Sequence, residues 1–142
     1  MSCKIPAEVN DYLELVETGK YRVCKEQQAL AALIRKVFRT EDLHVNIEQL
    51  HHYMGLEKYF SFKHLFPWEK FLVALWDCTY KPDGLPRWKT VFCMLGRGSG
   101  KDGFIAFDAF ASVSHIIRLG ITMWIYAPIM RSKQNALFRK LS

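Results

Sequence analysis

Residues 95–102 have the sequence Leu95-Gly96-Arg97-Gly98-Ser99-Gly100-Lys101-Asp102, and Gly103 follows. A short apolar run, Thr90 to Leu95, precedes this glycine loop, and a second one, Thr122 to Ala127, comes later. Such runs, rich in β-branched and aromatic residues, are typical of strands buried on both faces. The residues between them, from about Lys101 to Arg118, have helical spacing. This order predicts an α/β unit of strand, glycine loop, helix and parallel strand, followed by a helix from about Arg131 to Leu141.

The glycine loop has three features that favour binding of a phosphate chain. Glycines let successive backbone N–H groups turn toward one anion without Cβ clashes. The helix that follows directs the positive end of its dipole at the same point. Lys101 adds a full positive charge that can reach the β- and γ-phosphates of a nucleotide. The alternative is a glycine-rich turn that only lets the helix pack closely against the strand.

The loop departs from the strict phosphate-loop pattern at two positions. That pattern, G-x-x-x-x-G-K followed by Ser or Thr, would have glycine in place of Leu95 and a hydroxyl in place of Asp102. The hydroxyl normally binds Mg²⁺, and a carboxylate is also a hard oxygen ligand that Mg²⁺ accepts. Asp102 therefore predicts either a metal-linked role or reduced hydrolysis, and both alternatives stay open.

The first half of the chain has helical patterns only. Helices are predicted where apolar residues recur at helical spacing between residues that start or stop helices: Glu8 to Glu17, Lys25 to Phe38, a segment after Asn46 ending at Gly55, and one starting at Pro67. We expect a helical N-terminal region over residues 1–60 and an incomplete phosphate-loop domain over residues 61–142. Asp108 interrupts the apolar pattern of the helix after the loop, and we expect it to face a polar seam without a chemical role.

Composition narrows the classes of protein that are possible. Half of the 142 residues are hydrophobic and 24% are charged, which excludes a disordered tail and allows a real core. No apolar run approaches the roughly 20 residues of a membrane span, and no signal peptide is visible, so an intracellular protein is expected. The four cysteines form no C-x-x-C pair, which argues against zinc. The net charge of +6 fits either a polyanionic partner or a plain basic surface.

Two motifs resemble those of the large subunit of tailed-phage DNA-packaging terminases. In that family the phosphate loop often lacks its first glycine and carries an early arginine, in the form x-R-x-x-G-K, which Gly96 to Lys101 fits. Upstream, Pro67-Trp68-Glu69 resembles a Pro-Trp-Gln motif associated with adenine, with Glu69 in place of glutamine. Packing of Trp68 in the core is the alternative interpretation of that motif.

The resemblance implies a P-loop NTPase fold and an ATPase motor that moves viral DNA into the capsid. It implies that Lys101 holds the phosphates, that Arg97 stabilises charge during phosphoryl transfer, and that Pro67, Trp68 and Glu69 frame the adenine. The implied cofactors are ATP and Mg²⁺, with Asp102 on the metal. The other residues implied around the nucleotide are Gly96, Gly98, Ser99, Gly100 and Gly103.

The resemblance also implies partners and a location. The partners would be double-stranded viral DNA, the portal protein, the small terminase subunit and further copies in a homo-oligomeric ring, with no membrane involved. The location would be the host cytoplasm, for a chain encoded by a virus or prophage.

The chain ends before the acidic pair that would hold Mg²⁺ and before any nuclease domain, so we expect an N-terminal piece that is inactive alone. The alternatives are another P-loop NTPase, helicase-like or a kinase, and a non-enzymatic helical module with a vestigial loop.

Overall fold

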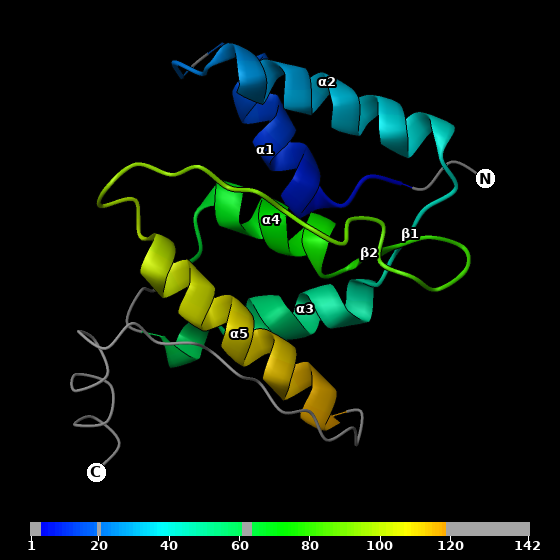
Figure 1. Cartoon of the computed structure of the whole chain (residues 1–142), viewed down its shortest axis with the longest axis vertical. Helices are drawn as coiled ribbons and strands as arrows, with labels where there is room; N and C mark the ends of the chain where they lie inside the picture. The colour runs from blue at the N-terminus through cyan, green and yellow to red at the C-terminus, as the bar shows by residue number, and fades with distance from the viewer. Residues whose placement is uncertain (1–3, 20, 61–63, 119–142) are drawn as a thin grey trace.

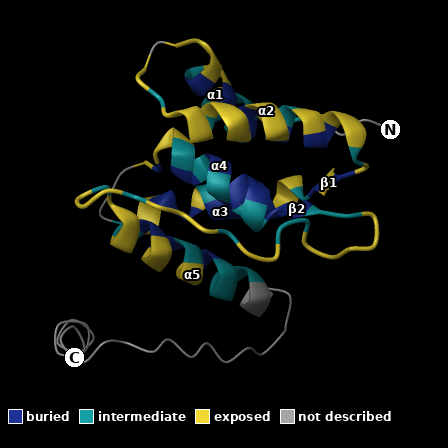
Figure 2. Cartoon of the chain, turned by 45° about the horizontal axis from the view of Figure 1, so that its top comes forward, coloured by how far each residue is buried: buried dark blue, intermediate teal, exposed yellow. Residues whose placement is uncertain are grey.

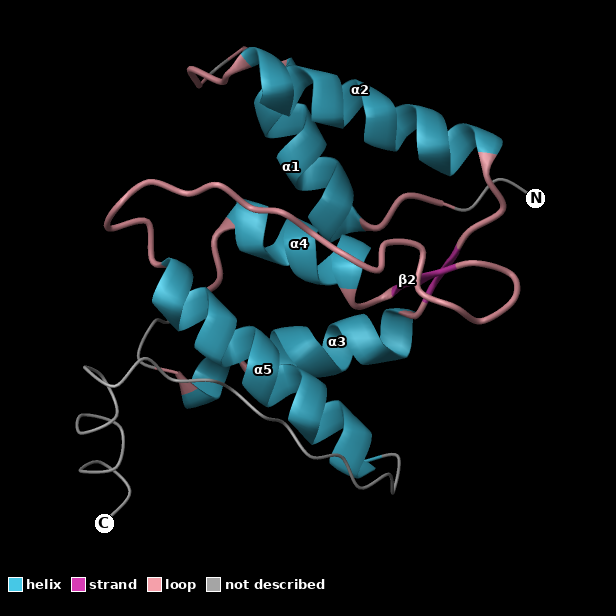
Figure 3. Ribbon diagram, viewed as in Figure 1, coloured by secondary structure: helices cyan, strands magenta, loops and turns pink. Residues whose placement is uncertain are grey.

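The computed structural model describes residues 4–19, 21–60 and 64–118. Five α-helices, one short 3-10 helix and two very short strands lie in this part of the chain (Figures 1 and 3). In chain order they are α1 (Ala7–Glu17), α2 (Lys25–Thr40), β1 (His44–Val45), α3 (Ile47–Gly55), η1 (Glu57–Tyr59), α4 (Pro67–Trp76), β2 (Thr79–Tyr80) and α5 (Lys101–Arg118).

Helix α4 lies at the centre of the molecule. It packs against α1 on one side and against α3 on the other, while α2 covers α1 and α5 covers α3 (Figure 1). The inward faces of these helices supply one apolar core, which includes Leu13 of α1, Ile34 of α2, Phe71 of α4 and Phe107 of α5. Figure 2 shows buried residues concentrated on α4 and on the faces turned toward it. The core runs across the predicted boundary at residue 60, and that division stays a prediction.

The helices begin and end close to where the sequence predicts them. The N-cap of α3 is Asn46, whose side-chain oxygen accepts a hydrogen bond from the Gln49 N–H at 3.0 Å. Pro67 occupies the first turn of α4, where its missing N–H costs nothing. The predicted helices at Glu8–Glu17, Lys25–Phe38 and Lys101–Arg118 are confirmed as α1, α2 and α5.

A two-stranded antiparallel ladder joins the segments that precede α3 and follow α4. His44 of β1 pairs with Tyr80 of β2, and Val45 pairs with Thr79. This ladder could not be predicted from the sequence, because two-residue strands are too short to show a period. The ladder fixes the end of α4 beside the start of α3, since the N–H of Asn46 also donates to the carbonyl of Cys78 at 2.8 Å.

Residues 90–95, which were predicted to be a strand, do not form one in the structure. A strand needs the backbone of a neighbour to pair with, and the predicted neighbour at residues 122–127 lies outside the described residues. Gly120 and the helix predicted from Arg131 also lie outside them. Phe92 and Met94 are 86% and 84% exposed, and Cys93 between them is exposed too, so the middle of this apolar run faces water. The parallel α/β unit therefore stays a prediction.

No helix in the described part of the chain combines the length and apolar character that crossing a membrane requires.

Candidate functional site

The glycine loop lies at the surface and leads directly into α5. Gly98 and Gly100 have positive φ angles of 79° and 81°, in a region of backbone space that favours glycine. The N–H of Ser99 donates to the carbonyl of Gly96 at 3.3 Å and closes the turn, and the N–H of Phe104 donates to Gly100 at 3.0 Å to begin the helix. A Cβ at any of the three glycines would meet nothing within 4 Å. Gly98 and Gly100 are therefore required by backbone conformation and not by crowding, whereas neither reason applies to Gly96.

The loop offers positive charge to solvent. The side chains of Arg97 and Lys101 are exposed, and Lys101 is the first residue of the 18-residue helix α5. The partial positive charge of the α5 N-terminus adds to these two cations. The Ser99 hydroxyl is buried and has no hydrogen-bond partner among the described residues. An anion at this position would be held by a helix end and by Lys101.

The first turn of α4 contacts the first turn of α5. The rings of Trp68 and Phe104 pack with their centroids 5.3 Å apart and tilted by 59°. This contact brings the Pro67-Trp68-Glu69 motif and the glycine loop, which are about thirty residues apart in sequence, to the same end of the molecule. Pro67 lines a different space, a cavity of about 250 Å³ between α1 and α4 that Glu8, Asp11 and Lys70 also border.

Glu69 has a structural task that the sequence analysis did not predict. Its side chain is only 5% exposed, and Oε2 accepts a hydrogen bond from the Phe66 N–H at 2.7 Å, which caps the start of α4. Burial raises the pKa of Glu69, the Phe66 N–H counteracts the rise, and the charge of Glu57 adds to it. The sequence signal was a carboxylate three residues after the residue that precedes Pro67, which is capping-box spacing.

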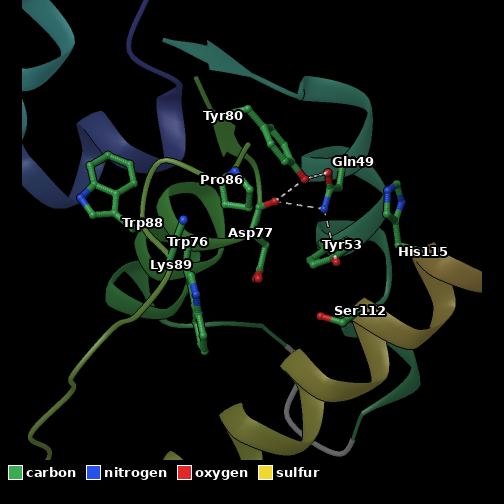
Figure 4. A pocket seen from close by; sticks show the side chains of 10 residues that line it. All are labelled: Gln49, Tyr53, Trp76, Asp77, Tyr80, Pro86, Trp88, Lys89, Ser112 and His115. Atoms are coloured by element: carbon green, nitrogen blue, oxygen red, sulfur yellow. Dashed lines mark hydrogen bonds between the residues drawn. The ribbon is translucent and has the colours of Figure 1, made fainter. Parts of the chain in front are cut away.

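A cavity of about 300 Å³ lies between α3, the end of α4 and α5 (Figure 4). The Tyr80 hydroxyl is 2.8 Å from Gln49 Oε1 and 2.8 Å from the carbonyl oxygen of Asp77. Gln49 Nε2 donates to the same carbonyl at 3.1 Å. Tyr53 and Ser112 face the cavity from α3 and α5, so its wall is polar on that side.

Two carboxyl groups meet beside this cavity. Asp77 caps the end of α4, and Asp108 faces it from α5. Burial, the charge of Asp108 and a hydrogen bond with it together raise the pKa of Asp77 to about 9. Burial also raises the pKa of Asp108, although the hydrogen bond from Asp77 opposes that rise. A polar seam was expected at Asp108, but Asp77 was not predicted to be the residue that faces it.

The described residues contain no group of three or more His, Cys, Asp or Glu side chains placed to hold a metal ion. Asp102 is exposed at the start of α5, and its role as a metal ligand stays a prediction. Comparison with protein-family models, with curated proteins and with solved structures gives no match for this chain.

Proposed function

We propose that the loop from Gly96 to Gly103 binds the phosphate chain of ATP, as part of the nucleotide-binding portion of a phage terminase large subunit. One observation carries the proposal. Two glycines with positive φ, Gly98 and Gly100, stand immediately before the exposed N-terminus of an 18-residue helix whose first residue is Lys101. This combination of turned backbone, helix dipole and lysine charge is suited to a polyphosphate.

The chemistry of the loop residues fits a nucleotide with its metal. Lys101 would neutralise the β- and γ-phosphates, and Arg97 would offset charge that develops during phosphoryl transfer. The Ser99 hydroxyl, which has no partner among the described residues, would donate to a phosphate oxygen. Mg²⁺ supplies further neutralisation of phosphate charge when bound, and Asp102 offers it an oxygen ligand.

The adenine would lie on the side of the loop nearest the start of α4. The contact between Trp68 and Phe104 supports this assignment because it joins that turn to the first turn of α5. Trp68 would provide the apolar surface for the base, whereas Pro67 lines the separate cavity between α1 and α4. Glu69 would act indirectly, since its carboxylate already caps α4 and thereby fixes the position of Pro67 and Trp68.

The wider role follows from the resemblance of the loop and the Pro-Trp-Glu motif to terminases. In that role ATP hydrolysis by the complete enzyme drives viral DNA into the capsid, in the cytoplasm of the host. The DNA, the portal protein, the small subunit and a ring of identical subunits would be its partners. The net charge of +6 suits a polyanionic partner such as DNA.

The test is the thermal stability of the chain with and without Mg-ATP. A ligand present at about 100 times its Kd adds about 2.7 kcal/mol of stability. We expect this gain in the wild type and its loss in Lys101→Ala. The matched control is Lys36→Ala, which removes one exposed lysine from α2 and should leave the gain intact. Adenosine should give a much smaller gain than ATP in every variant, because it has no phosphate for the loop to hold.

Equal gains in the wild type and in Lys101→Ala would show that the loop is not the site. An equal loss of the stability gain in Lys101→Ala and Lys36→Ala would show that ATP binding depends only on the net positive charge of the chain.

A further inference from the structure

The cavity between α3, the end of α4 and α5 has mostly aromatic walls. Four rings line it, those of Tyr53, Trp76, Tyr80 and Trp88. Its volume of about 300 Å³ lies at the lower end of the range of cavities that hold small molecules. The cavity therefore suits a small organic molecule with apolar groups.

The Asp77 carboxyl group is the polar feature of the wall that lacks a complementary charge. The Tyr80 hydroxyl, the Gln49 carboxamide and the main-chain carbonyl of Asp77 bond to one another, whereas the Asp77 carboxyl points into the space between Trp76 and Ser112 (Figure 4). Among the described residues, its Oδ2 has no hydrogen-bond partner and no basic side chain forms an ion pair with it. A carboxyl group beside aromatic rings favours a positively charged ligand, because the faces of such rings attract cations.

We propose that this cavity binds a small organic ammonium ion. The Asp77 carboxylate balances the charge of the ion, and the rings of Tyr53 and Trp76 contact its carbon substituents. The residues of the glycine loop do not line this cavity, so the inference does not depend on nucleotide binding.

The wall of the cavity is held in place by main-chain contacts. Tyr80 lies in β2, which pairs with β1, and it also forms an isolated β-bridge with Pro86. The N–H of Arg87 donates to the carbonyl of Thr79 at 3.0 Å, and this bond fixes the turn that leads to Trp88. The site is therefore formed before a ligand arrives, which reduces the entropic cost of binding.

Lys89 also lines the cavity and determines the sign of one test. It is exposed and forms no ion pair with a described residue. Its charge has the same sign as that of an ammonium ion. Lys89 therefore weakens the binding of a cation, whereas it would strengthen the binding of an anion.

The proton of Asp77 competes with the ligand. Burial, the charge of Asp108 and a hydrogen bond with it raise the pKa of Asp77 to about 9, so the empty cavity holds the acid at neutral pH. An ammonium ion replaces this proton, and its affinity rises with pH until the carboxyl group is ionised. The other titratable side chains around the carboxyl group are Tyr53, Cys78, Tyr80, Lys89, Asp108 and His115.

The test is a titration of the full chain with two ammonium ions, choline and phenethylammonium, and with dimethylbutanol, a neutral alcohol that has the shape of choline. The indole N–H signals of Trp76 and Trp88 report binding by NMR, and the signal of Trp68, which packs against Phe104, is the internal control. At about pH 8 we expect choline to bind about tenfold more tightly than the alcohol. Between pH 7 and pH 8 the affinity for choline should rise about tenfold, and that for the alcohol should stay constant.

Three variants locate the charge recognition. Asp77→Asn should remove the preference for choline over the alcohol. Lys89→Met should increase that preference, because it removes a charge of the same sign. Asp42→Asn, at an exposed position, should leave the preference unchanged.

Three results would overturn the proposal. No shift of the Trp76 and Trp88 signals with either ammonium ion at about 10 mM would exclude the site. Equal affinities of the wild type for choline and dimethylbutanol would show that the cavity selects shape and not charge, and the wild type alone decides this even if Asp77→Asn alters the fold. An undiminished preference for choline in a folded Asp77→Asn would assign the recognition of charge to another group.

Discussion

Replacing Asp77 by asparagine should remove a large part of the dependence of stability on pH. Burial, the charge of Asp108 and a hydrogen bond with it raise the pKa of Asp77 from 3.8 to about 9 in the folded chain. In the unfolded chain the carboxyl returns to its ordinary value. Between these two values the folded chain holds a proton that the unfolded chain has released. Stability contributed by this group is thus fully present below pH 3.8 and is lost as the pH rises toward 9.

The size of the effect follows from the pKa difference. One extra proton in the folded state lowers the free energy of unfolding by about 1.4 kcal/mol for each pH unit. From pH 5 to pH 8 the loss is about 4 kcal/mol, against a typical total of about 5–15 kcal/mol. Asparagine keeps the volume of the side chain and an N–H donor for Asp108 but takes up no proton. The two proteins should be similarly stable near pH 5, and Asp77→Asn should be the more stable at pH 8.

Urea unfolding followed by circular dichroism at pH 5, 6, 7 and 8 measures this difference. Glu17 and Glu41 have pKa values lowered mainly by hydrogen bonds from arginines, so their contributions to stability are lost only on the acid side. They are present in both proteins and cancel in the difference. Asp42→Asn, at an exposed position, should keep the wild-type slope. Parallel curves for the wild type and Asp77→Asn would show that the pKa of Asp77 is not raised in the folded chain.

Three further sets of substitutions test the core packing, a helix cap and an ion pair. Phe107→Ala, at a fully buried position in the core, should cost about 3–5 kcal/mol in urea unfolding, and Phe110→Ala, at a position 46% exposed, roughly half as much. Asn46→Ala should cost about 1 kcal/mol by removing the cap of α3, and Asn46→Asp should restore it. Arg87→Ala breaks a two-bond ion pair with Glu41 and should cost only about 0.2–1 kcal/mol, with most of that cost disappearing in 1 M salt.

The helices could be predicted from the sequence because their signals are local. The apolar stripe of α2, the Asn46 cap and Pro67 at the start of α4 each act within one or two helical turns. The glycine loop belongs to the same class, since a positive φ at Gly98 and Gly100 is a local property of the backbone. Such features do not depend on which distant segment the helix packs against.

The positions of Asp77 and Asp108 and the pairing of β1 with β2 could not be predicted, because they depend on contacts between residues far apart in sequence. Asp77 and Asp108 are separated by thirty residues, and nothing near Asp77 indicates that a carboxylate will face it. Asp108 itself gave a partial signal, because it follows Phe104 by four residues and so lies on the buried stripe of α5. Glu69 gave two competing signals, a place in the adenine motif and capping-box spacing, and the hydrogen bond that it accepts from the Phe66 N–H is the cap.

The position of α5 links the proposed site to the rest of the molecule. The helix is held at its first turn by Trp68 against Phe104, in its middle by Asp77 against Asp108, and further along by His52 against Ser114. The first contact lies beside the loop, and the second lies one helical turn further along α5. A nucleotide that binds only the docked helix would favour that docking by the same free energy with which docking favours the nucleotide. Phosphate binding and the packing of α5 would then be two effects of one docking equilibrium, because α5 carries the loop at its N-terminus.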